Sequence, residues 1–381
     1  MGKVIMIGCD LHAKTMVLRT ALDRGEPESL IFANTTAGRQ KLIDTFHRRV
    51  AQVGGARVVL AYEASSQGFG LYDQLTDAGF ECHVLAPTKI ARSAKHKRDK
   101  GDQQDAQQLL ELVRADVLAG NELPKVWVPS RETRDDRELV RSRMDIVQKM
   151  TRLKVQIKGL LARQQLARPK GTGQGWTRLF VAWLRGLPLP IGSRRTLDSL
   201  IRQIDFYERE LKQFDEALDQ LAYSPRYAQS VQALCQLVGV GVVTALVFLT
   251  EIGDPRRFAN RRQIAAYLGL VPSRHESGER ADCKGHITHQ GPARVRTVLC
   301  QAAWTRVRYE NDDQAAYRRL VRKNPKHKKI ALVATMRRLG IRMWHEAVRG
   351  LDRPAASPWE RDQRPQVPPP GPHLLPSLCS C

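Results

Sequence analysis

The sequence predicts a mixed α/β domain in the first third of the chain, followed by mostly helical regions. Residues 4–9 and 57–63 are short, continuously apolar runs, which are typical of buried central strands. Residues 15–22 alternate apolar and polar side chains, as a half-exposed antiparallel strand does. From residue 131 onward, apolar residues recur at helical spacing over long stretches. These three patterns predict an α/β domain joined to an all-α part.

The N-terminal domain is expected to hold five strands, at residues 4–9, 15–22, 28–32, 57–63 and 81–86. Helices are expected at about residues 36–50, 68–78 and 102–118. The residues from Asn34 to Thr36 offer an N-cap for the first of these helices. Three strands in succession, then alternating helices and strands, describe a mixed sheet covered by helices on both faces. This is the RNase H-like, or RuvC-like, arrangement, and we assign it to residues 1–130.

Two long helices are predicted next, within residues 131–225. In the first helix, apolar residues recur at alternating steps of four and three, at Ile146, Met150, Leu153, Ile157 and Leu160. The second helix, about residues 194–222, repeats this seam from Leu197 to Leu221. Sustained heptads of this kind predict a coiled coil. The two helices could pair with each other as a hairpin or with a second subunit.

Residues 226–346 are expected to form a compact, mostly helical C-terminal domain. Residues 237–241 (Leu-Val-Gly-Val-Gly) have the outline of a helix-hairpin-helix turn, in which glycines let backbone N–H groups approach a phosphate. An ordinary turn between two helices explains these glycines nearly as well. A polar loop follows at residues 273–280, and a basic helical region ends near residue 346. Residues 347–381 are rich in proline and lack periodicity, which predicts a disordered tail.

The charge balance of the chain indicates a polyanionic partner. The chain has 62 Lys and Arg against 39 Asp and Glu, a formal net charge of +23, and nucleic acid is the usual partner of such a chain. A membrane surface is the weaker alternative, because no apolar run approaches the roughly 18–20 residues that a span needs. We see no secretory signal, and the seven cysteines lack zinc or CxxC spacing. These features predict a soluble, cytoplasmic protein that associates with the nucleoid.

Four acidic residues carry most of the functional information. Asp10 and Glu63 each end an apolar run, while Asp102 and Asp105 share one face at the start of a predicted helix. An ionised carboxylate at the end of a buried strand is costly unless a cation compensates it. Oxygen ligands suit Mg²⁺, and a pair of such ions can hold both the attacking and the leaving oxygen of a phosphodiester. We therefore expect the four acids to bind Mg²⁺, with Mn²⁺ as the alternative, and to be catalytic.

Together with the C-terminal polar loop, these acids give the chain a recognisable pattern. It resembles the DEDD transposases of insertion sequence family 110, which are related to Piv-type site-specific DNA invertases, over about residues 1–345. The family's G-x-D, strand-end E and D-x-x-D-A correspond to residues 8–10, Glu63 and residues 102–106. Its later run of G-L-x-P, S-G, G-x-I-[ST]-K-x-G and R-x-x-L corresponds to residues 269–272, 277–278, 285–291 and 296–299. In place of the lysine of this run the chain has His289, and its helix-hairpin-helix turn lacks the usual proline.

The resemblance implies a DNA recombination enzyme. The RuvC-like domain would bind Mg²⁺ through the four acids, and Ser277 would attack a DNA phosphodiester and form a phosphoserine link. It also implies double-stranded donor and target DNA, a structured non-coding guide (bridge) RNA, and a homo-oligomer, either a dimer or a tetramer. Further residues suited to contact nucleic acid are cations, turn glycines and one histidine of the basic regions: Lys97, Arg98, Lys100, Arg152, Lys154, Lys158, Gly239, Gly241, Arg274, His289, Arg294 and Arg296.

Two other functions remain open at this point. In the first, the chain is a metal-dependent, structure-specific DNA nuclease in which water attacks and Ser277 is only a turn residue. In the second, it is a non-catalytic RNA-binding protein with inert acids, although the complete set of four acids argues against this. A covalent protein–DNA adduct distinguishes the transposase from the nuclease, and metal-dependent strand cleavage distinguishes both from the RNA-binding protein.

Overall fold

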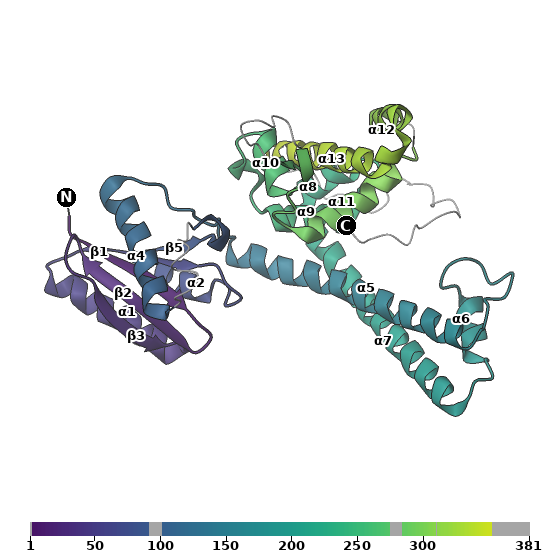
Figure 1. The fold of residues 1–381 in the computed structure, drawn as a ribbon, viewed down its shortest axis with the longest axis horizontal. Helices are drawn as coiled ribbons and strands as arrows, with labels where there is room; N and C mark the ends of the chain where they lie inside the picture. Colours follow the sequence, from purple (N-terminus) through teal and green to yellow (C-terminus); the bar gives the residue numbers. More distant parts are fainter. Residues whose placement is uncertain (1, 91–100, 275–283, 310, 353–381) are drawn as a thin grey trace. The chain divides into compact units, whose positions relative to one another are not determined.

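A computed structural model describes residues 2–90, 101–274, 284–309 and 311–352 (Figure 1). The chain divides into two compact units, Met1–Pro129 and Ser130–Cys381. In Figure 1 the strands of the first unit are purple, and the helices of the second unit run from blue through teal to yellow. Within the described ranges, no helix is long and apolar enough to cross a membrane.

The first unit is built on a five-stranded mixed sheet (Figure 1). Its strands are β1 (Val4–Leu11), β2 (Thr15–Leu22), β3 (Glu28–Ala33), β4 (Arg57–Glu63) and β5 (Glu81–Leu85). They lie in the order β3-β2-β1-β4-β5, with β1 antiparallel to β2 and parallel to β4, and with β5 parallel to β4. The continuously apolar strands β1 and β4 are central and buried over most of their length. All five predicted strands are present in one sheet, so the predicted mixed sheet is confirmed.

Helices cover both faces of this sheet. On one face lie α1 (Thr36–Gln52) and α2 (Gly70–Asp77), and on the other lies α4 (Asp102–Ala119); a short 3-10 helix, η1 (Pro87–Lys89), follows β5. Two separate apolar cores result, and neither contains side chains from the other face. The arrangement confirms the predicted mixed α/β unit with helices on both sides of the sheet.

Gly8 lets α4 approach β1 more closely than a side chain would allow. A methyl carbon at Gly8 would lie 2.8 Å from the carbonyl carbon of Leu109, and closer still to the carbonyl oxygen of Ala106 and the amide nitrogen of Leu110. All three are backbone atoms of α4, so they cannot turn aside as the end of a flexible side chain can. The missing side chain therefore fixes where the helix lies on the strand.

The second unit opens with two long helices that pack side by side, α5 (Arg131–Arg163) and α7 (Ile191–Ala222) (Figure 1). The start of each helix contacts the end of the other, as two polar contacts show: Arg143 Nε–Asp215 Oδ1 at 2.9 Å and Gln164 Nε2–Ser193 Oγ at 3.2 Å. The two helices are therefore antiparallel. The predicted seam residues face each other inside the chain; Ile204, for example, is 5% exposed.

A short helix between them, α6 (Arg178–Arg185), was not predicted. It adds Phe180 and Leu184 to the apolar core of α5 and α7. At eight residues it is too short for its periodicity to stand out from the surrounding loop.

The remaining described elements belong to the same compact unit as α5 and α7. They are α8 (Ala228–Cys235), α9 (Val242–Ile252), η2 (Pro255–Arg257), α10 (Arg261–Tyr267), β6 (Pro272–Arg274), β7 (Lys284–Ile287), α11 (Ala293–Arg306), α12 (Asp312–Lys323), η3 (Pro325–His327) and α13 (Lys328–Asp352). Met144 of α5 and Ala222 of α7 lie in one apolar core with α9, α11 and α13. The boundary predicted near residue 225 therefore falls inside this unit.

Two features of this region differ from the prediction. β6 and β7 pair as an antiparallel two-stranded sheet that was not predicted, and β6 overlaps the start of the polar loop expected at residues 273–280. Strands of three or four residues are too short to show alternation. Helix α13 continues to Asp352, so residues 347–352 belong to the helix and not to the predicted tail. The rest of that tail lies outside the described residues.

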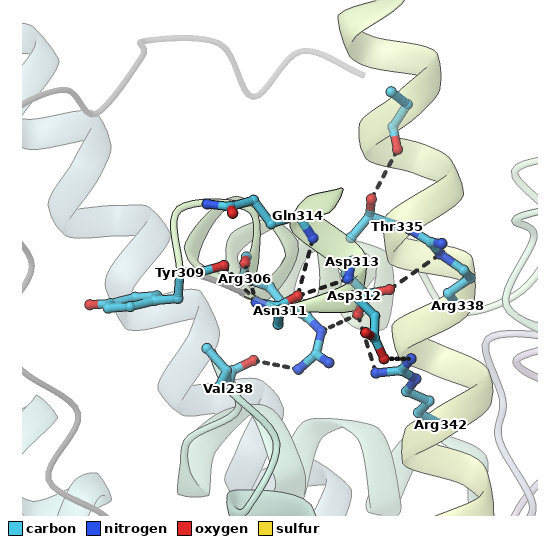
Figure 2. A network of polar contacts seen from close by, with 11 residues as sticks. Val238, Arg306, Tyr309, Asn311, Asp312, Asp313, Gln314, Thr335, Arg338 and Arg342 are labelled. Atoms are coloured by element: carbon cyan, nitrogen blue, oxygen red, sulfur yellow. Dashed lines mark hydrogen bonds and ion pairs between the residues drawn. The ribbon is translucent and has the colours of Figure 1, made fainter. Parts of the chain in front are cut away.

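A polar network joins α11, α12 and α13 (Figure 2). At its centre is Asp313, whose side chain is completely buried. Its carboxylate pairs with Arg306 of α11, and with Arg338 Nε at 3.3 Å and Arg342 Nη1 at 3.5 Å of α13. Arg306 also donates to the Val238 carbonyl oxygen at 3.2 Å, which connects the network to the turn before α9. One carboxylate thus anchors α12 to two neighbouring helices.

Candidate acidic active site

Asp10 and Glu63 lie next to each other at one edge of the first unit's sheet. β1 and β4 run parallel, and Cys9 of β1 pairs with Tyr62 of β4, so the next residues of the two strands are neighbours. Cys9 and Tyr62 belong to the core beneath α1 and α2. Because side chains alternate between the faces of a sheet, Asp10 and Glu63 point to the opposite face, which α4 covers.

Helix α4 brings the other two acids to this edge. Asp102 and Asp105 occupy its first turn, and the close packing of the helix on Gly8 holds that turn beside β1. Carboxylates are favoured in a first turn, because the N-terminus of a helix carries a partial positive charge. Asp105 is near enough for its charge to raise the pKa of Asp10.

His12 completes the cluster, although the sequence analysis did not select it. Its Nε2 lies 3.0 Å from Asp10 Oδ2 and 3.4 Å from Asp102 Oδ1. Ligand atoms of Asp10, His12 and Asp102 all lie within 4.8 Å of one another. The available signal was a histidine two residues after a strand-end acid, which is common and therefore weak.

The electrostatics of the cluster favour a cation. Burial is the largest effect and raises the pKa of Asp10, the His12 ring opposes it, and the charges of Asp105 and Asp102 add to it. A divalent ion would compensate both the lost hydration and the repulsion between these carboxylates. Carboxylate oxygens suit Mg²⁺ and Mn²⁺, and imidazole suits transition metals. The residues present therefore fit a divalent metal ion.

Two arginines predicted to contact nucleic acid are engaged within the second unit. Arg294 Nη2 pairs with Asp145 Oδ1 of α5 at 3.0 Å. Arg296 Nη1 donates to the carbonyl oxygens of Leu268 at 3.3 Å and Gln290 at 3.2 Å. These contacts join distant segments of the chain, so both side chains have a structural role. His289, in the same segment as Gln290, has a positive φ of 53°.

The glycines of the predicted helix-hairpin-helix turn lie before α9. Gly239 has a φ of +84°, and a methyl carbon there would lie 2.6 Å from the carbonyl oxygen of Ala302, so this turn packs closely on α11. Gly241 is the N-cap of α9 and offers no side-chain cap. Asp215 and Asp219 of α7 line the hollow beside this N-terminus. Arg143, which pairs with Asp215 at 2.9 Å, lines the same hollow.

Of the predicted α5 cations, Arg152 and Lys158 are exposed, and Lys154 Nζ lies 5.5 Å from the centre of the Trp176 ring. Lys97, Arg98, Lys100 and Ser277 lie outside the described residues, as does the side chain of Arg274.

Comparisons with known proteins agree with this arrangement. A transposase family model named for the DEDD transposases of IS110 matches residues 7–164, which include all four acids. A second model, described as "Transposase IS116/IS110/IS902 family", matches residues 231–318.

Among the similar individual proteins, two are named as transposases and one as a gene-inverting protein. A putative transposase, y4qE, of Sinorhizobium fredii is 34% identical over 65% of this chain and 58% of its own length. The transposase for insertion sequence element IS1111A of Coxiella burnetii is 26% identical over 62% of this chain and 63% of its own. The pilin gene-inverting protein of Moraxella bovis is 27% identical over 36% of this chain and 42% of its own. The chain thus spans less than two thirds of the length of these relatives. With its DEDD region and its C-terminal region both matched, the chain belongs to the IS110 family of transposases.

Proposed function

We propose that the chain cleaves and rejoins DNA strands during transposition of an insertion sequence. The observation that carries the proposal is the meeting of acids from β1, β4 and the first turn of α4, in a chain whose DEDD region matches a transposase family. The pilin gene-inverting relative is named for DNA inversion, which supports DNA as the substrate. The net charge of +23 supports a polyanionic partner.

In this proposal Asp10, Glu63, Asp102 and Asp105 hold one or two divalent ions, Mg²⁺ or Mn²⁺. Bound ions supply charge that stabilises the phosphorane-like transition state. The acids themselves are anionic, so they would hold these ions and would not bind the scissile phosphate directly. Gly8 acts indirectly, because it sets the distance between the β1 acid and the α4 acids.

Ser277 is the proposed nucleophile, on the strength of the family resemblance. Its hydroxyl oxygen loses a proton and forms a bond to phosphorus, the bond from phosphorus to a deoxyribose oxygen breaks, and the leaving oxygen takes up a proton, so protons balance over the step. The nearest rival, Ser273, donates its hydroxyl to the His286 carbonyl oxygen at 3.0 Å across the β6–β7 pair. That hydrogen bond is consistent with a structural role for Ser273.

A guide RNA and further copies of the chain are the other proposed partners. Exposed cations on α5, among them Arg152 and Lys158, offer contacts to nucleic acid. Apolar side chains on the outer faces of α5 and α7 support a subunit interface: Val155 is 61% exposed and Phe206 is 48% exposed.

The test is cleavage of donor and target DNA by full-length protein with Mg²⁺, followed by mass spectrometry of protein trapped on a nicked substrate. We expect a nucleotide adduct on the Ser277 peptide, none in Ser277→Ala, and no cleavage by Asp102→Asn. Ser273→Ala is the matched control for the nucleophile. Asp116→Asn is the control for the acids, since Asp116 lies on the same helix but pairs with Lys125 at 3.9 Å.

Three outcomes would contradict parts of the proposal. Normal cleavage by Ser277→Ala without an adduct would indicate a nuclease that uses water. Full activity of Asp102→Asn would remove the acidic cluster from the reaction. Equal affinity for the element's own non-coding RNA and for a scrambled RNA would argue against a guide.

A further inference from the structure

The ring of His12 lies near two carboxylates, whereas an ordinary surface histidine beside an acid has only one such neighbour. One ring nitrogen, Nε2, is within reach of carboxylates from two separate elements: Asp10 at the end of β1 and Asp102 at the start of α4. The three side chains remain accessible, with exposed fractions of 46% for His12, 20% for Asp10 and 60% for Asp102. A solvent-borne ion can therefore reach all three ligand atoms.

The backbone holds His12 in this place. Its N–H donates to the Thr15 carbonyl oxygen at 2.9 Å, which closes the turn between β1 and β2. Its carbonyl oxygen accepts from Asn34 Nδ2 at 2.7 Å, and Asn34 Oδ1 in turn accepts from Arg39 Nε at 2.7 Å. Because the backbone of His12 is already fixed, only its side-chain torsions lose freedom when the ring binds a ligand.

The same unit contains a histidine that lacks these properties. His83 also lies two residues after an acid, and its Nε2 is 2.9 Å from Glu81 Oε1. Among the described residues, however, only the Asp10, His12 and Asp102 group brings three possible metal ligands together. Pairing with one nearby carboxylate thus does not distinguish His12 from His83, whereas the second carboxylate within 3.4 Å of the His12 ring, that of Asp102 in α4, does.

Resting on the proposed function, we infer that His12 is a ligand of the divalent ion at the acidic site, and that its ring favours Mn²⁺ over Mg²⁺. The chemistry follows from the donor atoms. Mg²⁺ takes oxygen ligands almost exclusively, whereas a transition metal gains from an imidazole nitrogen. Removing the ring should therefore weaken Mn²⁺ binding much more than Mg²⁺ binding.

The experiment uses full-length protein and Mn²⁺ alone as the probe. Electron spin-echo spectroscopy of bound Mn²⁺ detects a directly coordinated ¹⁴N nucleus, and calorimetry gives the affinities for Mn²⁺ and Mg²⁺. Wild-type protein and His83→Gln should show the ¹⁴N coupling. His12→Gln should lose it and bind Mn²⁺ at least about tenfold more weakly, within the range known for altered metal-site partners. Circular dichroism confirms that each variant is folded.

The outcomes separate this inference from the proposed function. If Mn²⁺ binds but the ¹⁴N coupling is absent, or persists in His12→Gln, the histidine is not a ligand and the metal site itself stands. If wild-type protein binds neither ion while Asp10→Asn behaves identically, the metal site fails and the inference fails with it.

Discussion

The contact between Gly8 and α4 makes the substitution Gly8→Ala a direct test of how the acidic site is assembled. A methyl carbon at Gly8 would lie 2.8 Å from the carbonyl carbon of Leu109, whereas carbon–carbon contacts are normally about 3.5–4.0 Å. Two other α4 backbone atoms are closer still. Helix α4 must therefore retreat by about 1 Å, because atoms of a helix backbone move only with the helix.

The expected cost combines two opposing effects. Overpacking a core against a rigid neighbour costs about 3 kcal/mol. Replacing glycine by alanine at an allowed backbone conformation raises the free energy of unfolding by up to about 1 kcal/mol, because the unfolded chain has less conformational freedom. We expect a net loss of about 2 kcal/mol, and a fall of about 100-fold in strand cleavage, since a misplacement of 1 Å can have that effect.

Hydrogen exchange followed by mass spectrometry suits this test, since it reports the opening free energy of β1 and α4 peptides in the intact two-unit chain. Gly101→Ala is the matched control, because a methyl carbon there meets no atom within 4 Å; its helix-capping change costs less than about 1 kcal/mol. Protection of α4 within about 0.5 kcal/mol of wild type in Gly8→Ala, with unchanged Mn²⁺ affinity, would refute the reasoning.

Three further results are expected. Asp313→Asn should destabilise α12 and α13 by about 3–5 kcal/mol in hydrogen exchange, since it leaves buried arginine charge without its partner; Asp312→Asn, whose side chain is 92% exposed, should cost less than about 1 kcal/mol. Val155→Lys combined with Phe206→Lys should lower the mass measured by light scattering, and an unchanged mass would argue against this interface. Because burial raises the pKa of the Cys9 and Cys82 thiols, little thiolate forms at pH 8, so iodoacetamide should leave both unmodified in the folded protein; rapid alkylation would mean that the core opens readily.

The fold of the first unit follows from the sequence because its signals are local. The apolar run that ends in Asp10 and the one that ends in Glu63 each identify a buried strand without reference to the rest of the chain. Strand alternation and helical periodicity then place the acids on the correct faces. Short elements such as α6 and the β6–β7 pair carry too few residues for either period to be visible.

The site could be predicted only in part, because its remaining features depend on distant contacts. His12 is a candidate metal ligand because Asp102 lies near its ring. The proximity of His12 and Asp102 depends on how α4 packs on Gly8. Arg294, which was predicted to contact nucleic acid, pairs with Asp145, 149 residues earlier in the chain. No local sequence pattern distinguishes an arginine that is free to bind a ligand from an arginine that is paired with an acid elsewhere in the fold.

The docking of α4 has a consequence for the dynamics of the first unit. The candidate ligands come from β1, the turn after it and α4, so an ion bound to them would tie the helix to the sheet. Each opening of α4 would have to release that ion first. At an ion concentration of 100 times the dissociation constant, this linkage adds about 2.7 kcal/mol to the free energy of opening. Cellular divalent ions would then influence how often the helix detaches, because α4 opens less often over a loaded site than over an empty one.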